Sequence, residues 1–448
     1  MKESSRSLLD LVLSRGSDAM SFLALESGMR HWYDAPAPEG TGACVAFVDV
    51  GAWVAACGPL VGEGERARAA ARFVRAARDQ GRRACFFATE SLESTGMSRL
   101  LLGEQPVFHR DTWLRGLHRQ RRLREQLRRA SAKGVRVRRV EAPELREGAP
   151  LRGEIERLAD DWLRSRHIEP MSFLVSVEPF HHPEEHRYFI AEHRGRVVAF
   201  LSAVPIGPRR GWLVEDVFRH GHAPNGTTES LVHALMRGVA DGEYVTLGLT
   251  PLSGPVVWPL RAMRWLTRPL FDFAGLRAFR ERMHPATWQP VWLVYPRSQL
   301  AAVTLLDGLR AFARGSLVAF AARSFLRHPS GLPWTLALPL PLWTAGLAWL
   351  VASHRAWVLG FPPFELGLWV AFDVLLLLVL VRVAMRPRRA GLVAATSLAV
   401  IDAALSIGHF VWVGPGSTVL QASLRTTATI APAIGSLLLA WATAQATM

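Results

Sequence analysis

The sequence predicts an α/β protein continued by an all-α segment that crosses a membrane. Strand-like and helix-like apolar periodicities alternate through roughly the first 298 of 448 residues. After residue 331 the chain consists largely of apolar runs. The distribution of charge along the chain is also uneven. The formal net charge is +15, and most of the positive excess lies before residue 330. A basic protein of this kind attracts phosphates, either of nucleic acid or of an anionic membrane.

The stretch 212–254 carries the clearest α/β signal. An apolar strand, 212–218, ends at Arg219 and is followed by the Pro-Asn-Gly turn 224–226. A helix is predicted next, because apolar residues recur there at helical spacing, and a strand is predicted at 245–249. Charged groups at a strand end beside a helix N-terminus can hold an anion or a reacting carbonyl.

The remaining elements fit the order of an acetyltransferase-like α/β domain. That order is helix, hairpin, strand, helix, strand, helix and strand, and the residues before 110 are a weaker echo of it. Helices are predicted at 1–35, 63–80, 151–166 and 275–282, and strands at 43–48, 52–56, 84–88, 188–191, 197–204 and 291–295. We expect domains at 1–140 and 141–298, an amphipathic interfacial linker at 299–330 and a membrane bundle at 331–448.

The segment 115–139 holds eleven basic residues and a single acid, Glu125. Its first part is predicted to be a helix with one apolar side. A solvated helix face is the ordinary interpretation of a charge run, but so many like charges repel unless polyanions lie nearby. We therefore expect phosphate binding, and the residues expected to bind tRNA phosphates are Arg121, Arg122, Arg124, Arg128, Arg129 and Lys133.

No metal site or cofactor is expected. Cys44, Cys57 and Cys85 lack CxxC spacing, and His220 and His222 lack a third ligand at a convincing spacing. Ser253 is no nucleophile elbow, because the GxSxG context is absent.

Four membrane spans are predicted, at 333–351, 364–383, 392–413 and 430–443 with flanks. Arginines between the second and third spans place that loop and the soluble part in the cytoplasm. Asp373, Asp402 and His409 are ionisable groups within the spans. They are expected either to serve transport or lipid handling or to have a structural place, with Asp373 near a bent helix and Asp402 paired with His409 across two turns.

Several ordered motifs resemble the catalytic domain of the phosphatidylglycerol lysyltransferases, the aminoacyl-phosphatidylglycerol synthases. The resemblance covers about residues 21–295 and rests on EDVFR (215–219), APNGT (223–227), LGLTPLSG (247–254), GPLVG (58–62), RRASAKG (128–134), DWL (161–163) and GLRAFR (275–280). The segment 169–176 departs from the family pattern, and this chain has a small C-terminal bundle where familiar members have a large N-terminal membrane domain.

The resemblance implies two tandem acetyltransferase-like (GNAT) domains and a reaction that modifies membrane charge. An aminoacyl group, lysyl or similar, moves from aminoacyl-tRNA to a phosphatidylglycerol hydroxyl at the cytoplasmic side of a bacterial inner membrane. Asp216 and Arg219 match the catalytic DxxR element of the family. The residues expected to bind substrate are Asn225, Gly226, Thr227, Gly248, Ser253, Arg280 and Arg282.

Two other functions stay open at this point. One is an acyl-CoA-dependent N-acyltransferase, although only Asn225-Gly226 precedes the helix where a pyrophosphate loop is expected. The other is a non-enzymatic lipid-handling membrane module.

The orientation of Glu215 can also be predicted. By strand alternation, Glu215 is expected to face away from the pocket that Asp216 faces.

Overall fold

The computed structural model describes residues 2–34, 42–165, 173, 177–266, 272–313, 315–317, 319–320, 323, 331–355, 358–385 and 389–445. The chain forms two compact units. The first holds the described residues up to 320, and the second holds those from 323 onwards. Each unit is described by itself.

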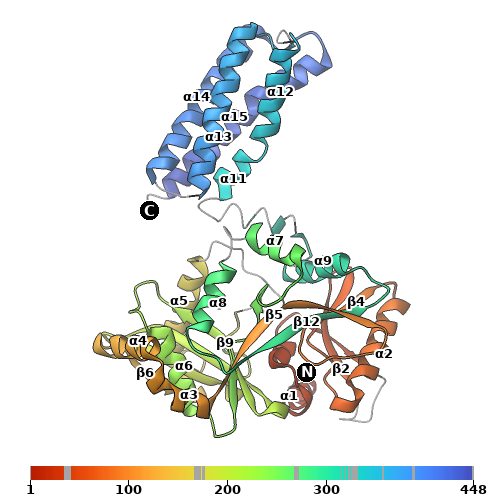
Figure 1. Cartoon of the computed structure of the whole chain (residues 1–448), viewed down its shortest axis with the longest axis vertical. Coiled ribbons are helices and arrows are strands. Elements are labelled where there is room, and N and C mark those ends of the chain that lie inside the picture. The colour runs from red at the N-terminus through yellow and green to blue at the C-terminus, as the bar shows by residue number, and fades with distance from the viewer. Residues whose placement is uncertain are drawn as a thin grey trace. The chain divides into compact units, whose positions relative to one another are not determined.

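The first unit is built on one continuous twelve-stranded sheet. Its order is β1-β2-β3-β4-β12-β5-β10-β9-β8-β7-β6, with β11 paired to β5. The long strands β5 and β12 lie at its centre (Figure 1). The strands are β1 (Arg30–Tyr33), β2 (Cys44–Asp49), β3 (Ala52–Ala56), β4 (Arg83–Thr89), β5 (Met97–His109), β6 (Arg136–Val140), β7 (Arg187–His193), β8 (Arg196–Ile206), β9 (Gly211–Arg219), β10 (Tyr244–Thr246), β11 (Thr250–Pro251) and β12 (Thr287–Pro296).

Helices cover both faces of this sheet. In the N-terminal half, α2 packs on one face, and α1, a 3₁₀ helix at Ala19–Leu25 and α9 pack on the other. In the C-terminal half, α3, α4 and α6 lie on one face and α5 on the other. The helices of the unit are α1 (Lys2–Arg15), α2 (Arg66–Asp79), α3 (Arg110–Gly116), α4 (Arg121–Ala132), α5 (Pro150–Arg164), α6 (Thr227–Gly238), α7 (Trp258–Leu266), α8 (Phe273–Glu281) and α9 (Ala301–Phe312).

The two halves repeat one arrangement. In the first, α2 connects the parallel strands β3 and β4, and in the second, α6 connects the parallel strands β9 and β10. The other strand pairs are antiparallel among the described residues. A crossover helix between parallel strands, entered from a hairpin, is the order that the sequence predicts for an acetyltransferase-like domain. The predicted α/β class and its weaker N-terminal echo are confirmed.

The boundary expected at residue 140 stays a prediction, and side chains before it pack with residues after it. Phe108, Trp113, Leu123 and Ala130 all belong to the core around α6. The basic helix α4 therefore packs on the C-terminal half. In return, the C-terminal strand β12 pairs with β4 of the N-terminal half, so the halves share one sheet.

The core beneath α6 explains why this helix forms. Leu231, Val232, Leu235 and Met236 are each at most 1% exposed and lie on its sheet-facing side. Burying a side chain of this size contributes about 1.5–3 kcal/mol. The spacing predicted from sequence is thus the face that holds α6 to the sheet.

The expected interfacial linker, 299–330, begins with α9. This helix packs on the N-terminal half of the sheet through Ala311, Leu305 and Phe312. Asp307 is buried and accepts two hydrogen bonds from the Arg83 guanidinium, each at 2.8 Å. The start of the segment is therefore attached to the α/β unit, and an interfacial position for its remainder stays a prediction.

The second unit is all-α and contains α11 (Gly331–Ala337), α12 (Leu340–Ala352), α13 (Pro363–Met385), α14 (Arg389–Val413) and α15 (Val419–Gln445). Among the described residues, three segments are long and apolar enough to span a membrane: Leu332–Ala352, Pro363–Met385 and Arg389–Val413. The fourth expected span, 430–443, lies in α15, which also contains Gln421, Arg425 and an internal Pro432, and α15 is not among those three.

Candidate functional site

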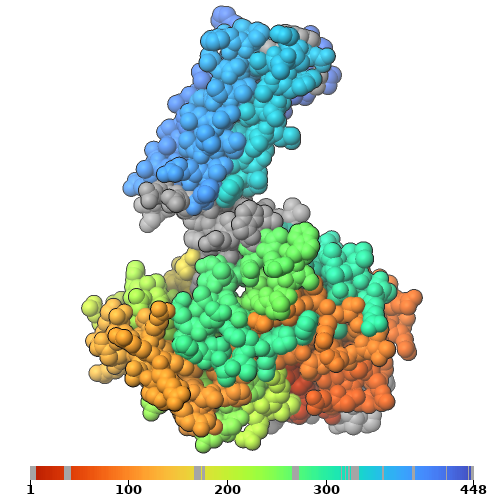
Figure 2. Space-filling model, viewed as in Figure 1, coloured from red at the N-terminus to blue at the C-terminus, as the bar shows by residue number. Residues whose placement is uncertain are grey.

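A cationic pocket of about 910 Å³ lies between α4, the start of α6 and the end of α8. Arginines from three separate segments line it: Arg121, Arg122 and Arg129 from α4, Arg219 from the end of β9, and Arg282 from the residue after α8. The carboxylates of Glu125 and Glu229 also line it. Helix α4 lies on the outer surface of the unit, in the lighter orange region at the left of Figure 2.

Gly226 sets the distance between the two helices. It caps α6 with φ of +91°, and a Cβ there would lie 2.2 Å from the backbone oxygen of Gln126 in α4. Only glycine combines this backbone conformation with so close an approach. The Thr227 N–H donates to the Pro224 carbonyl, and the next two residues of the first turn, Thr228 and Glu229, line the arginine-lined pocket. The N-terminus of α6 therefore adjoins this pocket.

The pocket keeps an excess of positive charge. Hydrogen bonds from Arg128 and Arg129 lower the pKa of Glu125 to about 2, so this carboxylate is ionised and neutralises part of α4. In the part of the chain that the structure describes, no carboxylate forms an ion pair with Arg219 or Arg282. Two uncompensated guanidiniums beside a helix N-terminus form a site suited to phosphates.

Asp216 lies on the opposite face of β9 from this pocket. Val214 and Val217 both belong to the core on the α6 side, although strict alternation would place residues three apart on opposite faces. The strand has an extra residue here, because Ser202 pairs with Asp216 and the next residue, Ala203, pairs with Val214. Glu215 and Asp216 therefore both point away from α6, and the expectation that they face opposite ways is wrong.

The carboxyl group of Asp216 is buried, with 8% of the residue exposed. Burial, and then the charge of Glu215, raise its pKa well above the usual range. The Ser202 hydroxyl donates to Oδ2 of Asp216 at 3.3 Å and accepts the Asp216 N–H at 3.1 Å. Ser202 thus fixes the orientation of this carboxyl.

The two residues of the DxxR element are therefore not neighbours in one pocket. The ladder between β9 and β10 covers only three residue pairs and ends at Leu213 and Thr246. Beyond that point β9 continues to Arg219 without pairing to β10. The edge of β9 that faces β10 is therefore unpaired from Val214 to Arg219, and no continuous ladder separates the two faces of the sheet there.

The residues expected to bind substrate divide into two groups. Asn225, Gly226 and Arg282 line the pocket with Arg219. Thr227, Gly248, Ser253 and Arg280 make contacts within the protein instead. The Thr227 hydroxyl donates to the Pro224 carbonyl at 2.7 Å. The Ser253 hydroxyl accepts the backbone N–H of Glu104 and donates to the Thr250 carbonyl. Substrate binding by this second group stays a prediction.

Arg280 holds the backbone just after β10 in place through hydrogen bonds. Its guanidinium donates to the carbonyl oxygens of Leu247 and Gly248 and to the Thr250 hydroxyl. Burial lowers the pKa of Arg280 to about 9, so the group keeps its charge at neutral pH. Of Arg280 and Arg282, which were both expected to bind substrate, Arg282 lines the pocket and Arg280 does not.

The residues expected to bind tRNA phosphates share one exposed surface. Arg124, Arg128 and Lys133 are exposed on α4 or just after it, and the pocket does not include them. They extend the positive surface outwards from Arg121, Arg122 and Arg129. A polyanion in the pocket could therefore continue along α4.

The membrane unit has a smaller pocket of its own, about 280 Å³. Asp373, Asp402, Ser406, His409 and Arg425 line it among apolar and aromatic side chains. The ionisable groups that the sequence places inside the spans therefore face the bundle interior.

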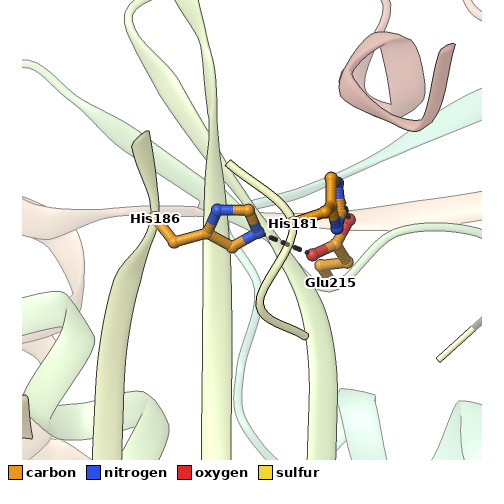
Figure 3. A group of neighbouring side chains, drawn as sticks. All are labelled: His181, His186 and Glu215. Atoms are coloured by element: carbon orange, nitrogen blue, oxygen red, sulfur yellow. Dashed lines mark hydrogen bonds and ion pairs between the residues drawn. The ribbon is translucent and has the colours of Figure 1, made fainter. Parts of the chain in front are cut away.

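A group of residues that the sequence analysis misses lies beside Asp216. His181, His186 and Glu215 bring three metal-ligating side chains together (Figure 3). The available signal is the segment HHPEEH at 181–186, followed 29 residues later by Glu215. It is a weak signal, because the bulge that turns Glu215 towards the histidines cannot be read from the sequence.

The comparisons with known proteins agree with this architecture. The family profile described as phosphatidylglycerol lysyltransferase, C-terminal, matches residues 10–295. The chain belongs to this family. It is a family of transferases, named for lysyl transfer to phosphatidylglycerol, and the resemblance seen in the sequence motifs is confirmed.

Two solved structures are similar over nearly their full length. One is the C-terminal domain of a candidate lysylphosphatidylglycerol synthetase from Agrobacterium fabrum, with 22% identity and a TM-score of 0.60, covering 70% of this chain and 98% of that one. The other is L-PGS from Bacillus licheniformis, with 21% identity and a TM-score of 0.58, covering 69% and 96%. At these identities the likeness shows the fold. No curated protein matches the chain.

Proposed function

We propose that this protein is a membrane-anchored aminoacyltransferase that moves an aminoacyl group from aminoacyl-tRNA to a hydroxyl of phosphatidylglycerol. The observation that carries the proposal is the cationic pocket, where Arg219 and Arg282 meet the N-terminus of α6 in a chain of this family. Phosphate groups of the tRNA acceptor end fit such a site, and α4 extends it with further arginines.

The reaction exchanges one ester for another. The lipid hydroxyl oxygen attacks the aminoacyl carbonyl carbon, the bond to the tRNA ribose oxygen breaks, and the hydroxyl proton ends on that ribose oxygen. Since little bond energy changes, the protein mainly has to orient two substrates and stabilise an oxyanion. Arg219 supplies positive charge for phosphate or oxyanion on one face of β9, and Asp216 orients the hydroxyl or the aminoacyl amine on the other.

We propose that transfer takes place at the unpaired segment of β9, and the end of the β9–β10 ladder at Leu213 and Thr246 supports this proposal. A donor whose phosphates lie in the pocket can extend its aminoacyl end past the last β9–β10 pair, Leu213 and Thr246, towards Asp216. Arg280 keeps the chain after β10 in place beside this passage.

The apolar helices anchor the enzyme in the membrane that holds its acceptor. Arg382 and Arg389 flank the connection between α13 and α14, which favours a cytoplasmic position for that connection in a bacterial inner membrane. A cytoplasmic active unit has access to aminoacyl-tRNA. Aminoacylation of phosphatidylglycerol would make the membrane surface less negative, which opposes the binding of cationic peptides.

Mass spectrometry of lipids from cells expressing the full chain tests the proposal. We expect a new aminoacyl ester of phosphatidylglycerol, formed in membranes only when aminoacyl-tRNA is supplied and abolished by ribonuclease. Arg219→Ala should greatly reduce the amount of product, whereas Arg237→Ala, at an exposed position near the end of α6, should leave it unchanged. No new lipid in cells where the protein is abundant would refute the proposal. Ribonuclease-resistant activity with acyl-CoA would replace it with an N-acyltransferase.

A further inference from the structure

The side chains on the Asp216 face of β9 carry an inference independent of aminoacyl transfer. His181 and His186 come from the segment before β7, and Glu215 comes from the bulge of β9. One ligand atom from each of them lies within 4.8 Å of the other two. Figure 3 shows both imidazole rings beside the Glu215 carboxylate. His186 has a fully buried side chain, and those of His181 and Glu215 are 15% and 8% exposed.

The hydrogen bonds of the two rings fix where their protons lie. Nδ1 of His181 is 2.6 Å from the carbonyl oxygen of Glu178, and Nδ1 of His186 is 3.0 Å from that of His182. A carbonyl oxygen only accepts, so each Nδ1 must carry the hydrogen. In a neutral imidazole the other nitrogen, Nε2, then presents a lone pair.

Each Nε2 atom lies close to a carboxylate oxygen of Glu215, which is also an acceptor. Nε2 of His186 lies 3.0 Å from Oε2 of Glu215, and Nε2 of His181 lies 3.9 Å from Oε1. Lone pairs of nitrogen and of a carboxylate repel each other unless something positive lies between them. A positive species, either a proton or a metal ion, is therefore required at this place.

A proton explains only part of the arrangement. Protonated His186 would form an ion pair with Oε2 of Glu215. Nε2 of His181 and Oε1 of Glu215 would still be buried without a hydrogen-bond partner, as both are among the described residues. A buried polar atom without a partner costs about 1–3 kcal/mol. A single cation bound to both imidazoles and the carboxylate would give a partner to Nε2 of His181, to Nε2 of His186 and to both carboxylate oxygens of Glu215.

The ligand set matches a transition metal of intermediate softness. Two imidazole nitrogens and one carboxylate occur in zinc sites that leave one coordination position open. Ligands of a tetrahedral zinc ion lie about 3.3 Å apart, given bonds of about 2.0–2.1 Å, and the two nitrogen–oxygen distances here are 3.0 and 3.9 Å. Backbone carbonyls that accept from each Nδ1–H are the usual outer partners of metal-bound histidine.

The surroundings would hold such a site rigidly. Phe22 packs against the rings of both histidines, with centroid distances of 5.7 and 5.3 Å. Tyr188 stacks on His186 at 5.2 Å. The rings therefore have little freedom to turn away from Glu215.

We propose that His181, His186 and Glu215 bind one divalent transition-metal ion, with zinc as the expected metal. The ion joins the segment 178–186 to the bulge of β9, immediately beside Asp216. The site stands whether or not the chain transfers aminoacyl groups.

The test is the metal content of the full chain, purified in detergent through a tag without histidine. We expect about one equivalent of zinc, or of another first-row transition metal, by mass spectrometry of the metals. After removal by a chelator, the melting temperature should fall, and Co²⁺ should restore it and give the visible absorption bands of a four-coordinate site. His181→Ala should lose the metal and the bands, while His222→Ala, an exposed loop histidine, should keep both.

Wild-type protein alone is enough to overturn the proposal. A chain purified with less than about a tenth of an equivalent of metal, which then binds neither Zn²⁺ nor Co²⁺ at micromolar concentrations, would show that a proton occupies the site instead. A negative result for metal binding would leave the transferase proposal untouched, because none of these measurements is an assay of enzymatic activity.

Discussion

The two faces of β9 differ in almost every physical property. On the α6 side, Arg219 points into an open, arginine-lined pocket with uncompensated positive charge. On the other side, Asp216 is buried, bonded to Ser202 and adjacent to a carboxylate and two histidines. One face is built to attract a polyanion from solution, and the other to hold a few polar groups in fixed positions.

Under the proposed function, this difference separates substrate binding from the transfer reaction within five residues of sequence. The β-bulge makes the separation possible, because it turns both Glu215 and Asp216 to the face opposite Val214, Val217 and the pocket. Substitutions on the two faces should therefore change different kinetic or binding properties of the protein.

Arg219→Ala should have the largest effect. Loss of a bidentate contact to phosphate or oxyanion costs roughly 2.7 kcal/mol, equivalent to about a hundredfold fall in kcat/KM. Arg219→Lys should recover only part of it, because an ammonium lacks the planar fork of a guanidinium. Steady-state rates with aminoacyl-tRNA measure both variants. Wild-type rates from the alanine variant would exclude a role for the pocket.

Gly226→Ala should disrupt the pocket by moving α4. The new Cβ would meet the Gln126 oxygen at 2.2 Å in a strained backbone, so unfolding should become easier by about 1–3 kcal/mol. Gly221→Ala is the matched control, because a Cβ there meets nothing within 4 Å. Thermal melting of both variants checks this. Equal stability would mean that α4 and α6 are not held as closely as described.

Ser202→Ala tests the other face. It removes the hydroxyl that orients Asp216, and we expect about a tenfold fall in kcat with unchanged KM for tRNA. Ser230→Ala is the control, since that hydroxyl donates to the carbonyl of Gly226, the N-cap of its own helix. An effect of Ser202→Ala on tRNA affinity alone would contradict the division between the faces.

The smallest effect is expected from the outer part of the pocket. Arg121→Gln with Arg122→Gln should weaken tRNA binding several-fold and reduce the slope of log affinity against log salt by about one to two units. Arg75→Gln with Arg78→Gln removes the same charge from exposed positions on α2 and should leave the slope unchanged. Binding titrations at several salt concentrations distinguish the two. Identical slopes would indicate that only net charge matters.

The sequence predicts the elements whose signal is local. Helix α6 and the three apolar spans follow from periodicity and composition, which need no knowledge of neighbours. Strand β5 has no such signal, because Gly103 and Pro106 interrupt it. Gly103 is required there since a Cβ would lie 2.2 Å from the Thr250 oxygen of β11, a contact between distant segments.

The candidate site is predictable only in part for the same reason. Charge counting finds the arginines of α4, and motif order finds Asp216 and Arg219. The bulge at Glu215 depends on the pairing of β8 with β9, so alternation assigns Glu215 to the wrong face. The cluster with His181 and His186 depends on that bulge and is missed with it.

The most direct test of the two-face account compares the kinetics of Arg219→Ala and Asp216→Asn with aminoacyl-tRNA and phosphatidylglycerol vesicles. The account predicts that Arg219→Ala chiefly raises the KM for aminoacyl-tRNA, by a factor that shrinks as salt rises because a phosphate contact is lost, whereas Asp216→Asn lowers kcat and leaves that KM unchanged. If both substitutions change the same parameter with the same salt dependence, the two residues act at one place and the account is wrong.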